Sequence, residues 1–285
     1  MSKETLIVST SGGRTSMLMA IWLKRTKSHI YNLVFVFANT GQEHEETLNF
    51  IKRVDEKWRL GIVWLEAVTH YGERKGCTFR EVNYYSASRE GEPFESMIIK
   101  YGIPNKAYPH CNRELKLNPM MKWRKEFYPD AKFAVGIRSD EIDRMSIKAD
   151  KDRVIYPFIS MHPTTKSDVL HWWRAYPEID LRIPEHHGNC KWCWKKSDRK
   201  LMTIALDNPE FFDFPKIMEE EYATHGANDD ERVFFRGKSS ANELIARAHT
   251  EDFKKFNDPH DYSYQLDTSN GCSESCEVFA DNLEV

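Results

Sequence analysis

Apolar runs alternate with helix-like segments in the first 66 residues. Residues 6–8, 33–38 and 62–66 are short, apolar and rich in β-branched or aromatic side chains. The two segments between these runs repeat their apolar side chains at helical spacing. Strand, helix, strand, helix, strand in this order predicts βαβ units, in which parallel strands form a sheet covered by helices.

The remainder of the chain extends the same pattern. Residues 132–138 predict a fourth strand and 154–158 a short fifth element, while the glycines and prolines of 70–112 predict long loops around a helix near 94–101. Further helices are expected near residues 113–127, 165–175, 197–207, 209–223 and 239–248. The prediction is an α/β fold: a Rossmann-like parallel sheet of about five strands with flanking helices. The expected domains are a nucleotide-binding domain over 1–175 and a helical, cysteine-bearing C-terminal region over 176–285.

Composition narrows the class of protein. The 285 residues are 40% hydrophobic and carry a net charge of −3, so bulk charge does not favour non-specific nucleic-acid binding. No apolar run approaches the roughly 20 residues of a membrane span. The N-terminus enters an apolar run at once and does not read as a secretory signal. A cytoplasmic protein without membrane contact is expected.

The stretch "STSGGRTSMLMA" joins the first predicted strand to the first predicted helix. A helix N-terminus offers free N–H groups and about half a positive charge to an anion, and glycine lets the backbone approach it closely. The stretch lacks both the Walker A and the G-x-G-x-x-G pattern. An ordinary turn is the alternative to a phosphate-binding loop. The candidate anion-binding residues are Ser9, Ser11, Gly12, Gly13, Arg14, Thr15 and Ser16.

The cysteines form a second pattern. Cys190-x-x-Cys193 fits a metal knuckle, a redox pair or chance. Together with Cys111 and with Cys272 or Cys276, it makes a four-thiolate set that suits a 4Fe–4S cluster or structural Zn²⁺. Zinc held partly by histidine is a further option, because two histidines precede the Cys-x-x-Cys knuckle. A basic run follows the knuckle and fits either a solvated helix start or an edge that faces a nucleotide or nucleic acid. These residues are His186 and His187, and Lys195, Lys196, Arg199 and Lys200.

Several motifs carry a resemblance to a known family. "SGGRTS" resembles the S-G-G-x-D/T-S loop of the PP-loop, or adenine-nucleotide α-hydrolase-like, superfamily. Further stretches resemble segments of the phosphoadenylylsulfate (PAPS) reductase family and occur in that family's order between residue 6 and about 175. They are "FANTGQEHEETLNF", "CNRELKLNP", "GIRSDEIDR" and "YPFISMHPTTKSDVLHWWR".

The resemblance implies a sulfonucleotide reductase. An adenine nucleotide (PAPS, adenylylsulfate or ATP) would lie across the strand ends, with its phosphate or sulfate in the glycine loop. A thiolate of Cys272 or Cys276 would act as nucleophile, and a thioredoxin- or glutaredoxin-like protein would supply electrons. Many relatives carry an iron–sulfur cluster, which favours the cluster over zinc here. The resemblance adds Asn39, Thr40, Gly41, Gly136, Arg138 and Arg144 to the nucleotide site, although each arginine also fits a surface salt bridge with Asp140, Glu141 or Asp143.

Two departures from the family pattern keep other functions open. Thr15 stands where many ATP pyrophosphatases carry Asp, which weakens the case for magnesium-dependent adenylation. The chain ends "NGCSESCEVFADNLEV" in place of the reductases' Glu-Cys-Gly-Ile/Leu-His-like segment. The alternatives are an ATP-dependent sulfur-transfer enzyme acting on tRNA or DNA, and a catalytically silent nucleotide-binding regulator. The sequence also leaves a homodimer open.

Overall fold

A six-stranded sheet forms the centre of the molecule. The computed structural model describes residues 3–72, 74–188, 190–225, 230–256 and 278. The strand order is β4-β3-β2-β1-β5-β6, and every neighbouring pair is parallel except β3 and β4. The strands are β1 (Glu4–Thr10), β2 (Tyr31–Asn39), β3 (Val63–Val68), β4 (Thr78–Val82), β5 (Lys132–Ala134) and β6 (Val154–Ile155).

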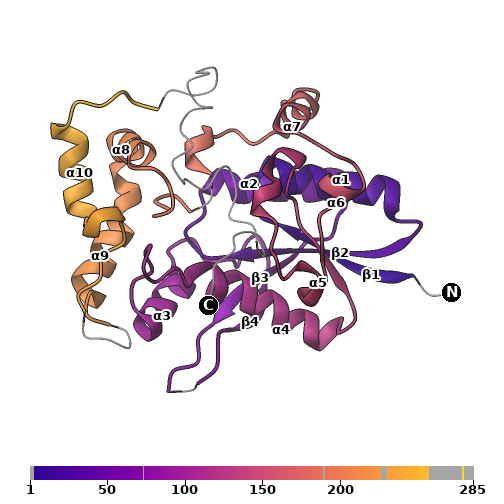
Figure 1. Cartoon of the computed structure of the whole chain (residues 1–285), viewed down its shortest axis with the longest axis horizontal. Coiled ribbons are helices and arrows are strands. Elements are labelled where there is room, and N and C mark those ends of the chain that lie inside the picture. Colours follow the sequence, from indigo (N-terminus) through magenta and orange to yellow (C-terminus); the bar gives the residue numbers. More distant parts are fainter. Residues whose placement is uncertain (1–2, 73, 189, 226–229, 257–277, 279–285) are drawn as a thin grey trace.

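Helices cover both faces of the sheet (Figure 1). Alternate residues of β1 point to opposite faces, so Leu6 and Val8 pack with α1 (Arg14–Lys27), α2 (Glu45–Trp58) and α7 (Lys166–Trp173). Ile7 packs on the other face against α4 (Asn118–Phe127). A parallel sheet buried on both faces needs apolar residues at successive positions, which is why these strands read as continuous apolar runs. The predicted α/β class is confirmed.

One strand was not predicted. β4 lies within 70–112, which the sequence predicted as loops around a helix; that helix is α3 (Glu92–Tyr101). The expected strand over 132–138 ends at Ala134, and the helix expected near 113–127 begins as a π-helical turn, η1 (Arg113–Leu117), before α4. Short elements follow β5: η2 (Ser139–Arg144), α5 (Ala149–Asp152) and α6 (Pro157–Ser160).

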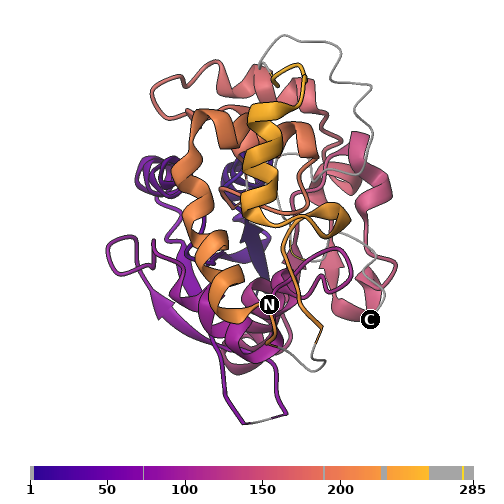
Figure 2. The same cartoon turned by 90° about the vertical axis from the view of Figure 1, so that its left-hand side faces the viewer.

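The C-terminal helices stand beside the sheet rather than on its faces. They are η3 (Glu185–His187), α8 (Asp198–Asp207), η4 (Pro209–Phe212), α9 (Asp213–Tyr222), η5 (Arg236–Lys238) and α10 (Ala241–Thr250). Figure 2 shows α8, α9 and α10 in front of the strands. Their apolar core includes Phe94 and Met97 of α3, so it extends across the predicted boundary at residue 176. No helix of the described residues has the length and apolar character needed to cross a membrane.

A half-buried carboxylate ties α9 to the segment that leads into α10. Glu219 accepts hydrogen bonds from the backbone N–H groups of Phe234 (2.9 Å) and Ala241 (2.7 Å). Burial is the largest influence on this carboxyl and outweighs the two hydrogen bonds, so that the pKa of Glu219 is raised from 4.5 to about 7.

This pKa predicts a stability that falls as the pH rises. A carboxyl whose pKa is higher in the folded state stabilises the fold fully below pH 4.5, and that stability is lost as the pH rises through about 7. We expect the free energy of unfolding to fall by about 2–3 kcal/mol over this range through Glu219 alone. Urea unfolding of wild type and Glu219→Gln at several pH values isolates the effect, because the other titrating groups are shared. Parallel pH profiles for the two proteins would contradict it.

Candidate functional site

The carboxyl ends of the central strands meet at a topological switch point. From β1 the chain proceeds outward through β2, β3 and β4, and it returns to β5 on the other side of β1. Ligands of open α/β sheets bind where the strand order reverses in this way. In Figure 1 the N-terminus marks the start of β1, and the strand runs from there toward the side where α8, α9 and α10 stand. The C-terminal helical region therefore lies at the strand ends.

The predicted glycine loop occupies this switch point, between β1 and α1. Gly12 has φ of +82°, and a Cβ there would lie 2.5 Å from Thr47 Cγ2 of α2. Ser11 and Ser16 tie the loop to the helix, since the Ser11 N–H donates to Ser16 Oγ at 3.0 Å and Ser16 Oγ donates to the Gly13 carbonyl at 3.1 Å. No side chain caps the N-terminus of α1, and no acidic residue lies in its first turn. The loop thus has the geometry and polarity of an anion site.

The chain after β5 lies against the glycine loop. A Cβ on Gly136 would lie 2.9 Å from Ser16 Cα, so only glycine allows this approach between backbones. Two residues later, the buried guanidinium of Arg138 donates to Thr15 Oγ1 at 3.3 Å. The structure therefore brings together Ser11, Gly12, Gly13, Thr15, Ser16, Gly136 and Arg138.

Carboxylates balance the charge of both predicted arginines. Arg138 contacts Asp140 at 3.0 Å and Glu141 at 3.3 Å, and Arg144 contacts Glu141 at 2.6 Å. The salt bridges that the sequence offered as an alternative are therefore present. The two pairs with Glu141 are buried, because the side chains of Arg138, Arg144 and Glu141 are 5%, 14% and 8% exposed, whereas Asp140 is 40% exposed. A pair of this kind fixes the direction of Arg138 toward Thr15, which pre-organises a donor at the helix N-terminus.

A buried polar cluster follows β2. Thr40 donates its N–H and its hydroxyl to the Glu43 carboxylate at 3.0 Å, and the ammonium group of Lys116 lies 3.8 Å from the same carboxylate. The sulfur of Cys190 lies 3.5 Å from Thr40 Oγ1. Burial raises the pKa of the Cys190 thiol well above its usual value, and the Glu43 charge raises it further. The predicted residues Thr40 and Cys190 thus share one site at the end of β2.

The Cys-x-x-Cys segment forms a tight turn. The Cys193 N–H donates to the Cys190 carbonyl at 3.1 Å, and Lys196, itself buried, donates its ammonium group to that carbonyl at 2.7 Å. Cys111 packs against the same apolar cluster as this turn, which includes Trp192. No disulfide joins the cysteines of the described residues, and within those residues no three His, Cys, Asp or Glu side chains are arranged to hold a metal ion. The other two predicted ligands and nucleophiles, Cys272 and Cys276, lie outside the described residues.

Three side chains predicted to bind nucleotide instead contact other parts of the protein, and a fourth predicted residue, Gly41, forms a turn. Ser9 donates its hydroxyl to the sulfur of Met120 in α4. Arg14 forms a two-point ion pair with Asp180, with its Nε 2.7 Å and its Nη2 3.1 Å from the carboxylate. Asn39 is buried and donates to the Glu66 carboxylate at 2.7 Å. Gly41, with φ of +80°, forms the turn after β2, where a Cβ would lie 2.5 Å from Ser88 Oγ.

Three charged residues near the strand ends were not singled out by the sequence. Glu43 and Lys116 form the buried pair described above, and Glu66 of β3 is fully buried beside Asn39. Lys116 belongs to the "CNRELKLNP" stretch and Glu43 to the "FANTGQEHEETLNF" stretch, so the resemblance offered a signal for both. Glu66 lies in no such stretch, and its partners Asn39 and Ser88 come from distant parts of the chain.

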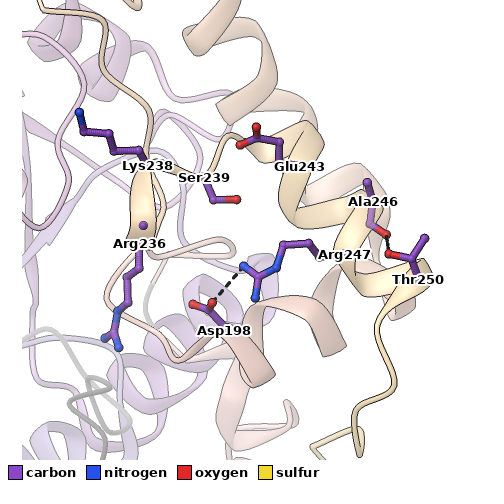
Figure 3. Close-up of a pocket in the computed structure, with 9 residues that line it drawn as sticks. Asp198, Arg236, Lys238, Ser239, Glu243, Ala246, Arg247 and Thr250 are labelled. Carbon is purple, nitrogen blue, oxygen red and sulfur yellow. Dashed lines mark hydrogen bonds and ion pairs between the residues drawn. The ribbon is translucent and has the colours of Figure 1, made fainter.

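The basic run after the Cys-x-x-Cys turn serves partly to hold the C-terminal region together. Lys196 closes the turn, and Arg199 donates to the backbone carbonyls of Lys254 and Lys255 at 2.8 and 3.1 Å. Beside this run lies a pocket of about 610 Å³ between α8, η5 and α10 (Figure 3). In that view Arg247 points to Asp198, whereas the side chain of Lys238 points away from α10. The pocket involves none of the predicted nucleotide-binding residues.

Fold and site together define an α/β protein with a glycine loop at the switch point of a mostly parallel sheet. No family model matches the sequence. The chain is 30% identical over 286 residues to the uncharacterized nin region protein ORF290 of Escherichia phage lambda, a match covering 98% of this chain and 96% of that protein. The chain belongs to the family of this phage protein.

Two further similarities are more distant. The uncharacterized protein MJ0066 of Methanocaldococcus jannaschii is 28% identical over 174 residues, which cover 60% of this chain and 31% of that protein. Among solved structures, the phosphate complex of a PAPS reductase from Candida auris aligns with a TM-score of 0.40 and 14% identity, over 62% of this chain and 74% of that one.

Proposed function

We propose that this protein binds an adenine nucleotide at its strand ends and acts as a sulfonucleotide reductase-like enzyme. One observation carries the proposal: the uncapped N-terminus of α1 lies at the switch point, with the buried Arg138 guanidinium bonded to the Thr15 hydroxyl of its first turn. Free N–H groups and a fixed guanidinium donate hydrogen bonds to a phosphate or sulfate group, and the helix dipole adds partial positive charge beside it.

The reaction class follows from the resemblance of the motifs to PAPS reductases. A thiolate of Cys272 or Cys276 attacks the sulfur of the bound sulfonucleotide. The bond from sulfur to the bridging oxygen breaks, its electron pair leaves with the nucleotide phosphate, and a cysteine thiosulfonate forms. A thiol of a thioredoxin-like protein then attacks the cysteine sulfur and releases sulfite. A second thiol of that protein resolves the mixed disulfide, so that two thiols are oxidised for each sulfite formed.

The metal group is a separate part of the proposal. Cys190 and Cys193 offer two thiols from one turn, and Cys111, two residues before η1, offers a third. The described residues do not complete a ligand set, so no step of the reaction is assigned to the metal. Iron, sulfide and zinc assays on anaerobically purified protein distinguish a 4Fe–4S cluster from zinc. We expect Cys190→Ser to lower the metal content, and Cys77→Ser, in the buried core, to leave it unchanged.

The experiment that tests the proposed function separates binding from turnover. Calorimetry with adenosine 3′,5′-bisphosphate, adenylylsulfate and ATP measures binding, and labelled sulfonucleotide with thioredoxin measures sulfite release under anaerobic conditions. We expect micromolar-range binding and sulfite release. The double variant Cys272→Ser/Cys276→Ser is expected to retain binding and to lose sulfite release.

The alternatives give different results in the same assays. Magnesium-dependent release of pyrophosphate from ATP in the presence of tRNA or DNA would identify a sulfur-transfer enzyme instead. Nucleotide binding without turnover of any substrate would identify a regulator. A chain that binds none of the three nucleotides would contradict the whole proposal.

A further inference from the structure

A pocket of about 530 Å³ lies on the outer side of α1, between this helix and the segment from α6 to α7. Leu18 and Ile21 of α1 and Phe158 of α6 are buried residues that line it. The rings of Trp22 and His162 stack beside them, with centroids 5.2 Å apart and planes 6° apart. This volume is typical of small-molecule sites, and aromatic walls favour planar ligands.

The pocket is separate from the candidate nucleotide site. Its α1 residues lie between Leu18 and Thr26, whereas the glycine loop precedes the helix at Arg14. None of the residues predicted to bind nucleotide, and none of the cysteines that the structure describes, lines this pocket. An occupant of the pocket would therefore be a second ligand, beyond the proposed function.

Charge at the rim of the pocket selects the class of ligand. Arg25 lines the pocket, is exposed, and forms no ion pair with a described residue. The ammonium group of Lys27 lies 5.4 Å from the centroid of the Trp22 ring and adds a second positive charge. Asp168 is the opposing charge, and hydrogen bonds from the N–H and the hydroxyl of Thr165 hold its carboxylate at the start of α7. Two cations therefore face one carboxylate. The balance favours an anionic group near Arg25.

We propose that this pocket binds a planar aromatic anion. The ring packs against Phe158, Trp22 and Trp172, and the carboxylate, sulfonate or phosphate group of the ligand faces Arg25. Burial of the ring supplies most of the affinity, because an exposed ion pair contributes little. Arg25 supplies the preference for an anion over a neutral or cationic ring of the same size.

Calorimetry of the full chain with three naphthalenes tests the assignment. Naphthalene-2-sulfonate, 2-naphthylmethanol and 2-naphthylmethylamine share a ring system and differ in charge. We expect the sulfonate to bind most tightly, and Arg25→Gln to weaken it about three- to five-fold while leaving the alcohol unchanged. Lys24→Gln is the matched control, since it removes the same charge one residue away, where the ammonium group lies over the Phe35 ring at 6.0 Å.

A second variant tests the place of binding. Thr26 is exposed in the last turn of α1 and lines the pocket, so Thr26→Phe fills part of the space without entering the core. We expect the sulfonate affinity to fall about ten-fold or more, with an unchanged circular dichroism spectrum. Equal binding of the three naphthalenes, an unaltered affinity in Arg25→Gln, or full binding to Thr26→Phe would each overturn the proposal. Adenine-nucleotide binding is unaffected by any of these outcomes, so the two proposals fail separately.

Discussion

Replacing Glu66 with alanine is expected to lower the free energy of unfolding by about 2–4 kcal/mol. The Glu66 side chain is fully buried in β3 and accepts hydrogen bonds from Asn39 Nδ2 at 2.7 Å, the Ser88 N–H at 2.6 Å and Arg80 Nη2 at 2.7 Å. Alanine leaves the Ser88 N–H and one N–H of Asn39 Nδ2 buried without this acceptor, and each such loss carries a desolvation cost. Arg80 adds little, because its side chain is 55% exposed and water replaces the lost anion. Urea unfolding monitored by tryptophan fluorescence measures the change.

An exposed glutamate of the same sheet provides the control. Glu4 of β1 lies 3.0 Å from Lys132 of β5, and both side chains are 46% exposed. Because exposed ion pairs contribute little, Glu4→Ala is expected to change stability by about 0.5 kcal/mol or less. Similar losses in the Glu66 and Glu4 variants would show that the burial and hydrogen bonds of Glu66 do not add to its contribution to stability.

The central fold could be predicted because its signal is local. β1 and β2 each contain one of the apolar runs and β3 overlaps the third, since a strand covered on both faces must be apolar at successive positions. β4 was not predicted, because it lacks a continuous apolar run. It pairs with β3 alone, at the edge of the sheet, and its sequence "TFREV" is half polar and mostly accessible. An edge strand of this kind carries no continuous apolar signal.

In the candidate site, too, features set by contiguous sequence could be predicted, whereas contacts between distant segments could not. The glycine loop was predictable because strand, loop and helix are contiguous in sequence. Arg14 looked like an anion-binding residue for the same reason, yet the structure pairs it with Asp180, 166 positions later. The Glu43–Lys116 pair also depends on packing between distant segments. Motif reasoning therefore predicted which segments form the candidate site, whereas the partners that orient each side chain or hold it elsewhere depend on the tertiary fold.

Replacing Gly12 with alanine is expected to weaken adenine-nucleotide binding about ten-fold or more and to destabilise the fold by about 2–4 kcal/mol. Two costs add. The φ of +82° is unfavourable for a residue with a Cβ, and that Cβ would lie 2.5 Å from Thr47 Cγ2 and 3.1 Å from Ile51 Cδ1. Relief of the clash must move the glycine loop away from α2, and the N–H groups of the loop move with it. Calorimetry with adenosine 3′,5′-bisphosphate and urea unfolding measure the two effects.

Two further variants separate the backbone cost from the clash. Gly61 has φ of +71°, and a Cβ there would meet no atom within 4 Å, so Gly61→Ala measures the backbone cost alone, about 1 kcal/mol. Thr47→Ser removes the clashing Cγ2, so Gly12→Ala/Thr47→Ser is expected to recover part of the stability and the nucleotide affinity lost in Gly12→Ala. An unchanged nucleotide affinity in Gly12→Ala would mean that the nucleotide binds away from the glycine loop. Equal destabilisation by Gly12→Ala and Gly61→Ala would show that α2 yields to the added methyl, and the close packing of loop and helix would then have no role in shaping the anion site.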